Sequence, residues 1–171
     1  RPLTEALAGR PYLVLVLLDA RDPGNAGTAI RTADAAGADA VVLARGPEGG
    51  SVDIHGGKAV RASAGSIFHV PVATGTWPEV LTSLRGAGLR VRATTTGGRL
   101  DLFAADLREP TAWVLGNEAH GLPPQVAAAC DETVSIPMRG RAESLNVAAA
   151  AAVCLYASAR AQEGVSRGEG T

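Results

Sequence analysis

The chain has 171 residues, 46% of them hydrophobic, which is the size of one compact domain with a single core. Its longest strongly apolar run, Tyr12 to Leu18, is far shorter than the roughly 20 residues of a membrane-spanning helix, and no secretory signal is evident. The net charge of -1 gives no overall attraction to a polyanion, although fifteen of the sixteen basic residues are arginine, the side chain best suited to phosphate. A GC-rich genome accounts equally well for that bias.

Continuous aliphatic stretches without alternation predict strands buried on both faces of a parallel sheet. In chain order they are Leu13 to Leu18, Val41 to Leu43, Leu89 to Ala93, Trp113 to Leu115 and Val134 to Ile136. Between them lie helix-forming segments, many of them alanine-rich, at Ala26 to Ala36, Lys58 to Ala64, Trp77 to Arg85, Val126 to Cys130 and Leu145 to Ala161. This alternation predicts an α/β fold, a parallel sheet flanked by helices, with ligands at the carboxyl ends of the strands.

One domain is expected over residues 1–161, followed by a flexible polar tail at 162–171. Cys130 and Cys154 lack the spacing of a zinc or redox site, so they are expected to be buried thiols, and the protein is expected in the cytoplasm. Aromatic residues make up only 4% of the chain, which argues against the stacking platform of single-strand-binding folds.

The first segment with chemical interest, DPGNAGTAIRTADAAG, directly follows the first strand. Pro23 and Gly24 predict a turn, and Asn25 is well placed as the N-cap of the next helix. Arg31 lies about 9 Å further along the helix axis, so its guanidinium is expected to reach the same space as Asn25. A capped helix with a solvated arginine remains the alternative for this segment.

The second segment, WVLGNEAHGL, runs from a buried strand into a loop with Gly116 and Gly121. Glycine permits positive φ there and lets a ligand approach the backbone closely. Asn117 and Glu118 follow the carboxyl end of the strand, where a carboxylate meets ligand. His120 is a possible general base, but a loop histidine beside glycine is more often a bystander.

The third segment, IPMRGRAESLNVAAAAA, joins the last strand to the apolar helix. Either Ser144 or Asn146 is a suitable cap for that helix. One cap suffices, yet further polar groups crowd the approach, namely Arg139, Arg141 and Glu143. Some of these side chains are therefore expected to serve a ligand.

Two other places are weaker candidates. Lys58 and Arg61 form a basic patch that either contacts phosphate or is a solvated helix face. Thr94, Thr95 and Thr96 end a predicted strand and are expected to line the same pocket. The sequence has no HExxH, paired CxxC or phosphate-loop motif, so no metal is expected, and the missing GxGxxG after the first strand argues against a Rossmann-type nucleotide-dependent enzyme.

The asparagine and arginine spaced by six residues, then GNExxGL, then IPM-x-G-x-x-x-SLNV, resemble in this order the SpoU or TrmH family of RNA 2'-O-ribose methyltransferases. The resemblance covers about residues 11–160. It implies a deep C-terminal trefoil knot, a homodimer, and S-adenosylmethionine held mainly by backbone atoms. The cofactor-binding residues that it implies are Thr94, Thr95, Leu115, Gly116, Asn117, Ile136, Met138, Ser144, Leu145 and Asn146.

The same resemblance implies that a ribose 2'-hydroxyl is methylated by a catalytic set comprising Arg31, Asn25, Glu118, Ser144 and Asn146. Arginine has a pKa too high for a free base at neutral pH, so a role in stabilising the developing alkoxide or anchoring a phosphate is the alternative. The expected RNA contacts are Asn25, Arg31, Lys58, Arg61, Arg139 and Arg141.

The resemblance favours ribosomal RNA as the substrate, because the segment VRASAGSIFHVPV looks like the ribosomal-RNA branch of the family. A transfer-RNA methyltransferase and a non-catalytic RNA-binding paralogue are the alternatives. Related enzymes often carry an N-terminal RNA-recognition domain, which is not expected within this chain. The target RNA and nucleotide do not follow from the three motifs.

Overall fold

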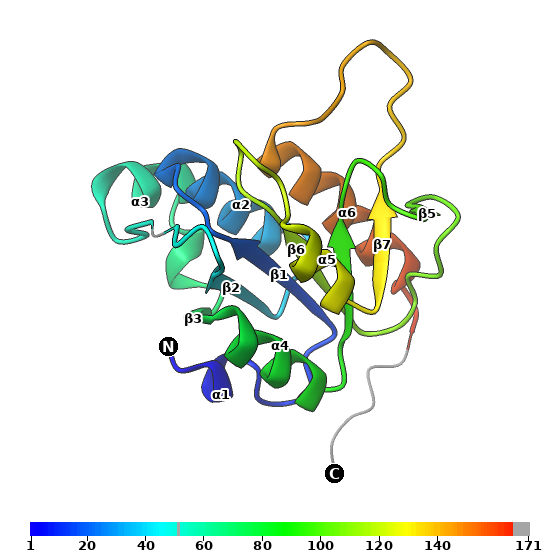
Figure 1. Cartoon of the computed structure of the whole chain (residues 1–171). Helices are drawn as coiled ribbons and strands as arrows, with labels where there is room; N and C mark the ends of the chain where they lie inside the picture. The colour runs from blue at the N-terminus through cyan, green and yellow to red at the C-terminus, as the bar shows by residue number, and fades with distance from the viewer. Residues whose placement is uncertain (51, 166–171) are drawn as a thin grey trace.

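The structure, a computed structural model, describes residues 1–50 and 52–165. Seven strands form one parallel sheet in the order β3-β2-β1-β6-β4-β7-β5. The strands are β1 (Leu13–Leu18), β2 (Ala40–Arg45), β3 (Val72–Thr76), β4 (Arg90–Thr94), β5 (Leu100–Asp101), β6 (Thr111–Leu115) and β7 (Glu132–Ser135). The predicted α/β fold, a parallel sheet flanked by helices, is confirmed (Figure 1).

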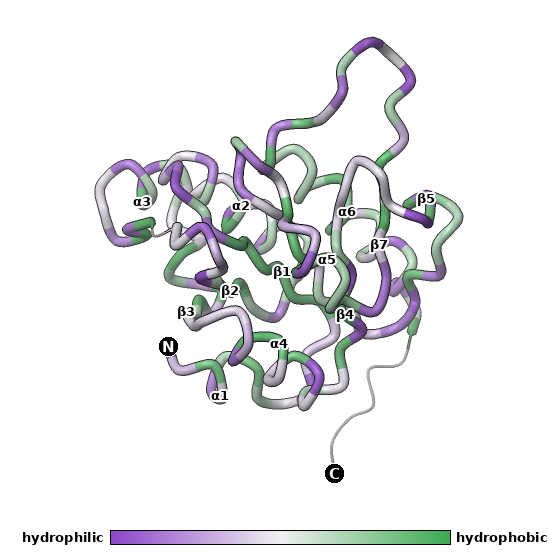
Figure 2. The backbone as a smooth tube through the Cα atoms, viewed as in Figure 1, coloured by the Kyte–Doolittle hydropathy of each residue, from purple (hydrophilic) through white to green (hydrophobic). Residues whose placement is uncertain are grey.

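Helices cover both faces of the sheet (Figure 1). They are α1 (Leu3–Ala6), α2 (Pro23–Ala35), α3 (Gly57–Ser63), the 3-10 turn η1 (Ser66–Phe68), α4 (Trp77–Gly86), α5 (Pro124–Ala129) and α6 (Val147–Ala161). Alternate residues of β1 enter two separate cores: Leu15 packs with residues of α2 and α6, and Val16 packs with residues of α1 and α4. This burial on both faces explains the unbroken aliphatic sequence of β1, which Figure 2 shows in green.

Two strands, β3 and β5, were not predicted from the sequence. The edge strand β3 contains Gly75 and polar residues, and the other edge strand, β5, is only two residues long. Strand β4 was expected to be aliphatic, but it carries Arg90 and Arg92, and Arg92 is 2% exposed. The two edge strands do not produce the continuous apolar signal on which the prediction depended, whereas β4 was predicted, at Leu89 to Ala93, in spite of its two arginines.

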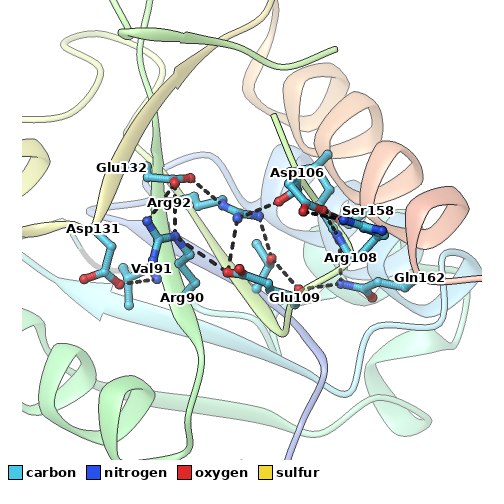
Figure 3. A network of polar contacts seen from close by, with 12 residues as sticks. Arg90, Val91, Arg92, Asp106, Arg108, Glu109, Asp131, Glu132, Ser158 and Gln162 are labelled. Atoms are coloured by element: carbon cyan, nitrogen blue, oxygen red, sulfur yellow. Dashed lines mark hydrogen bonds and ion pairs between the residues drawn. The ribbon is translucent and has the colours of Figure 1, made fainter. Parts of the chain in front are cut away.

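Arg92 is satisfied by partners from three neighbouring segments (Figure 3). Its guanidinium donates to a carboxylate oxygen of Glu132 in β7 at 2.8 Å, to the hydroxyl of Thr111 in β6 at 3.0 Å and to the carbonyl oxygen of Asp106 at 2.8 Å. Arg90 also donates to Glu132, at 2.8 Å. Burial raises the pKa of Glu132, but the hydrogen bonds from both arginines outweigh it and hold that pKa below its usual value. The network fixes β4 between β6 and β7.

The end of the chain differs in part from the prediction. Gln162, the first residue of the predicted tail, is buried rather than solvated, and its amide donates to the carbonyl oxygens of Tyr12, Leu107 and Glu109 at 3.1–3.4 Å. It therefore belongs to the packed domain, while residues 166–171 of the predicted tail lie outside the described part of the chain. Among the described helices, none combines the length and the apolar character needed to cross a membrane.

Candidate active site

A cavity of about 380 Å³ lies where β4, β6 and β7 reach their carboxyl ends. Its walls come from the segment after β4, the glycine loop after β6 and the segment between β7 and α6, which projects at the top of Figure 1. The lining residues are Thr94, Thr95, Thr96, Leu115, Gly116, Asn117, Glu118, Ala119, His120, Gly121, Leu122, Ile136, Met138, Glu143, Ser144, Leu145, Val147 and Ala150. Parallel strands that end together have thus gathered distant segments into one concave site.

The loop after β6 is shaped by two glycines and a buried asparagine. The Asn117 side-chain oxygen accepts from the backbone N–H groups of Ala119 at 3.0 Å and His120 at 2.8 Å, and Gly121 has a φ of +64°. A Cβ on Gly116 would lie 2.0 Å from the carbonyl carbon of Gly121. The sequence analysis expected a ligand to approach the backbone here; in the structure the group that lies close to Gly116 is the loop's own backbone at Gly121.

We therefore expect Gly116→Ala to disrupt the cavity, because the added methyl group meets backbone that cannot yield cheaply. Binding of S-adenosylhomocysteine, measured by calorimetry, should weaken at least about tenfold. Gly140→Ala is the matched control, since a Cβ there has no neighbour within 4 Å. Equal binding by the two variants would contradict the role given to the loop.

The inner wall of the cavity is formed by hydroxyl-bearing residues at the end of β4. The Thr94 hydroxyl lies 3.6 Å from the sulfur of Cys154 on α6. Burial raises the pKa of Cys154 to about 12, so the thiol stays protonated at neutral pH and is a poor nucleophile. Cys154 thus contacts Thr94 as a neutral thiol. The other cysteine, Cys130, is half-buried, and burial raises its pKa to about 12 as well.

A chain of hydrogen bonds joins the three sequence segments beside the cavity. The Asn25 amide donates to a carboxylate oxygen of Glu118 at 3.4 Å, and the Asn146 amide donates to the Asn25 side-chain oxygen at 3.1 Å. The expectation that Asn25 caps α2 is wrong, because Asp22 is the N-cap and accepts from the Asn25 backbone N–H at 3.0 Å. Capping by Asp22 leaves the Asn25 side chain available to join residues 93 and 121 positions away.

Asn146 has two roles at the start of α6. Its side-chain oxygen accepts from the backbone N–H groups of Ala148 and Ala149 at 2.8 and 3.3 Å, so it is the N-cap, while its amide binds Asn25. Of the two predicted caps, the structure selects Asn146 and leaves Ser144 exposed at the cavity.

The two roles of Asn146 can be separated by Asn146→Asp, because aspartate caps helices as well as asparagine does but has no amide donor. Thermal stability should therefore be retained, while the RNA methyl transfer that the family resemblance implies should fall about tenfold, since the Asn25 side-chain oxygen loses its donor and faces a carboxylate instead. The comparison variant Asn146→Ala should lose about 1 kcal/mol of stability as well. An unchanged rate for Asn146→Asp would show that the amide has no positioning role.

Arg31 lies outside the residues that line the cavity and has an exposed side chain. It is six residues from Asn25 on α2, which places the two roughly 120° apart around the helix. Four residues before it, Gly27 packs against α3, where an added Cβ would lie 2.4 Å from the Ala59 carbonyl oxygen. Arg31 therefore lies one turn along α2 from the contact with α3 and, contrary to the expectation that it shares the space of Asn25, outside the cavity.

The other predicted RNA contacts fall in two places. Lys58 at the start of α3 lies over the first turn of α2, where its side chain would be 3.2 Å from a Cβ on Gly24, and its charge helps to lower the pKa of Asp22 after the hydrogen bond from Asn25. Arg61 is on the same helix, while Arg139 and Arg141 are exposed on the loop between β7 and α6.

Nine of the ten predicted cofactor residues line the cavity, and the tenth, Asn146, binds next to it through Asn25. Of the predicted catalytic residues, Glu118 and Ser144 line the cavity, and Asn25 and Asn146 are tied to Glu118. Cavity residues outside the predicted sites are Thr96, Ala119, His120, Gly121, Leu122, Glu143, Val147 and Ala150. Thr96 was expected at the pocket together with Thr94 and Thr95, and the other seven lie within the second and third motifs although no site role was assigned to them.

A profile of the SpoU rRNA Methylase family matches residues 12–156, a range that contains all three segments and the whole cavity. The chain belongs to the SpoU family. Among curated relatives, the SpoU chain is 41% identical over 143 residues to the 23S rRNA (guanosine(2553)-2'-O)-methyltransferase RlmP of Bacillus subtilis, covering 83% of this chain and 56% of that protein. It is 40% identical over 159 residues to the 23S rRNA (guanosine-2'-O-)-methyltransferase RlmB of Ralstonia nicotianae, covering 92% and 62%.

Solved structures agree with this family membership. An AdoMet-bound rRNA methyltransferase from Sinorhizobium meliloti superposes with a TM-score of 0.85 and 37% identity, covering 94% of this SpoU chain and 60% of that one. The SpoU methyltransferase AviRb from Streptomyces viridochromogenes gives a TM-score of 0.82 at 35% identity, covering 89% and 60%. The chain therefore spans about 60% of the length of these relatives.

Proposed function

We propose that this chain is a methyltransferase domain that transfers a methyl group from S-adenosylmethionine to a ribose 2'-hydroxyl of RNA, with ribosomal RNA as the substrate. The observation that carries the proposal is the hydrogen-bonded chain Glu118–Asn25–Asn146 at the edge of a cavity built from all three family segments. Three polar side chains from distant segments, hydrogen-bonded to one another at that edge, favour an enzyme over a non-catalytic RNA-binding paralogue.

The residues of the cavity fit S-adenosylmethionine. About 380 Å³ is within the range of pockets that enclose small ligands. Aliphatic side chains such as Leu115 and Ile136 supply apolar walls for an adenine ring, while backbone groups of the glycine loop and the Thr94 and Thr95 hydroxyls supply polar contacts. When bound, this cofactor would supply the methyl group that the ribose accepts.

Positioning of the ribose and stabilisation of the developing charge are assigned to polar residues near the cavity. Asn25, Glu118 and Asn146 hold one another and would position the ribose at the cavity mouth. Because a guanidinium is a cation and a poor base, we assign Arg31 to the negative charge that develops on the 2'-oxygen or to the adjacent phosphate, with the proton of the 2'-hydroxyl passing to solvent. Ser144 lies at the cavity beside them.

Ribosomal RNA is the preferred substrate because the relatives described above are named as 23S rRNA or rRNA methyltransferases. One comparison favours transfer RNA instead: a structure described as concerning 2-OH methylation of C/U34 on tRNA has a TM-score of 0.77 and 33% identity, and this chain covers 99% of it. We keep transfer RNA as the second candidate for that reason.

The two substrates can be separated by incubating the protein with labelled S-adenosylmethionine and total RNA, followed by mapping of the blocked 2'-hydroxyl. Label in 23S ribosomal RNA is the expected result. Label at a transfer-RNA nucleotide would select the second candidate, and binding of S-adenosylhomocysteine without transfer to any RNA would overturn the proposed activity.

We further propose the knot, the dimer and the location that the family resemblance implies. After β7 the chain crosses back to place α6 against α2, β6 and β1, although β4 lies between β6 and β7, and this crossing supports a threaded C-terminal segment. The apolar α6 leaves Tyr156 52% exposed, which supports a second copy as its partner and is testable by sedimentation. The proposed ribosomal-RNA substrate and the two free thiols, which fit a reducing compartment, support a location in the cytoplasm.

A further inference from the structure

A strongly exposed aromatic ring, that of Phe68, is carried by η1, which packs against α2, the helix of Arg31. Phe68 is 75% exposed, at the end of η1, and its neighbours Ile67 and Val70 are buried in the core. A large apolar ring held in solvent offers stacking area that a planar partner can cover.

The backbone presents this ring in a defined position. Ala64 and Gly65 both have left-handed backbone conformations, with φ of +49° and +90°, and they turn the chain sharply from α3 into η1. Ser66 and Ile67, directly before the ring, are buried. Because residues on either side of it are anchored, Phe68 loses little further freedom when a partner binds.

The same turn is tied to α2 next to Arg31. The Asp34 carboxylate lies 3.4 Å from the His69 ring nitrogen, and hydrogen bonds from the side chains of Ser66 and then His69 lower the pKa of Asp34. Asp34 follows Arg31 by three residues, a spacing that makes side chains neighbours on a helix surface. The turn η1, which carries Phe68, therefore packs on α2 close to the helical turn that carries Arg31.

The charge around the ring identifies the kind of partner. Arg31 is on α2, and Lys58 and Arg61 are on α3, which packs against both α2 and η1. An exposed ring on an element flanked by two helices with exposed cationic side chains suits a single-stranded nucleic acid, whose bases stack on aromatic faces while its phosphates meet arginine and lysine. With one ring, this surface holds one base, which is consistent with the absence of a longer aromatic platform.

We propose that Phe68 stacks on an unpaired nucleobase of the RNA substrate, next to the nucleotide whose phosphate or ribose meets Arg31. This inference rests on the proposed function for the identity of the RNA as substrate. It adds a contact that selects RNA in which a base beside the target is unpaired, because only an unstacked base exposes its face to a protein ring.

The test compares binding of a 12-nucleotide oligouridine with binding of the same oligomer in which every ribose is abasic. The wild-type protein should prefer the oligomer with bases at least about fivefold. Phe68→Ala should abolish that preference, and Phe68→Trp should retain it with fluorescence quenching on binding. The chain offers a matched control, since its other phenylalanine, Phe103, is 68% exposed near the opposite edge of the sheet, and Phe103→Ala should keep the preference.

Two results would overturn the inference: an unchanged preference in Phe68→Ala, or a shift of that variant to a smaller oligomer in sedimentation, which would assign the ring to a second copy of the chain. Failure of the proposed function looks different. If the preference depends on Phe68 but no RNA is methylated, the proposed methyltransferase activity is contradicted and the stacking contact stands. If RNA is methylated but the preference does not depend on Phe68, the stacking contact is contradicted and the methyltransferase activity stands.

Discussion

Arg31→Ala should lower the rate of RNA methyl transfer about 10²- to 10³-fold, the usual loss when a preorganised group that stabilises developing charge is removed. Its binding of S-adenosylhomocysteine should be unchanged, because Arg31 is exposed on α2 and lies outside the residues that line the cavity. Single-turnover transfer and calorimetry on the same preparation measure the two quantities separately.

The lysine variant distinguishes the two roles left open for Arg31. Arg31→Lys keeps the charge but not the planar, bidentate geometry, so it should restore part of the rate if the group acts mainly on charge. A loss expressed only in KM for RNA would indicate phosphate anchoring, and a loss in kcat would indicate stabilisation of the reacting oxygen. Near-normal transfer by Arg31→Ala would remove it from the catalytic set.

Glu132→Ala should strongly destabilise the folded protein. It leaves the guanidinium of Arg92, which is 2% exposed, without its carboxylate partner in β7 (Figure 3). Breaking one side of a buried ion pair costs about 3–5 kcal/mol, which corresponds to a fall in Tm of about 6–20 °C for a domain of this size. Differential scanning calorimetry of the two proteins measures it.

Arg108→Ala provides the comparison, because its ion pair with Asp106 is also 2.8 Å long but both side chains are more than half exposed. That substitution should change Tm by no more than about 4 °C. A drop as large as that of Glu132→Ala would mean that burial is not what makes the Arg92 pair strong.

The pH dependence of the Glu132 effect has a defined sign. The pKa of Glu132 is lowered in the folded state, so the stability that it contributes is complete above its unfolded pKa and is lost as the pH falls through the lowered value. The stabilities of the wild-type protein and Glu132→Ala should therefore converge in acid, and a constant difference between them down to low pH would contradict the pairing.

The sequence was a good guide where one feature had one physical cause. The strand β1 is buried on both faces and reads as an unbroken aliphatic run, and the three motifs follow strands that end at one edge. Because the carboxyl ends of parallel strands meet, placing the motifs after strands was enough to bring Gly116, Ile136 and Leu145 into one cavity.

Prediction failed where a residue's role depends on a partner far away in the chain. Asn25 looks like a cap from local spacing, but Asp22 takes that role and Asn25 binds residues from two other segments. Gln162 was predicted to belong to the polar tail, but its amide donates to three carbonyl oxygens of the folded domain. Local patterns contain no information about such partners, so Arg92 was also missed as the centre of a network.

The position of the cavity in the chain has a consequence for biosynthesis. Every residue that lines it lies between Thr94 and Ala150, and the polar partner that completes its edge, Asn25, is made much earlier. A ribosome-bound chain that ends before α6 therefore has no complete site, whatever its first strands have already folded into. We expect a cofactor that requires the complete cavity to bind only the finished protein, and such binding would favour the final packing step by mass action.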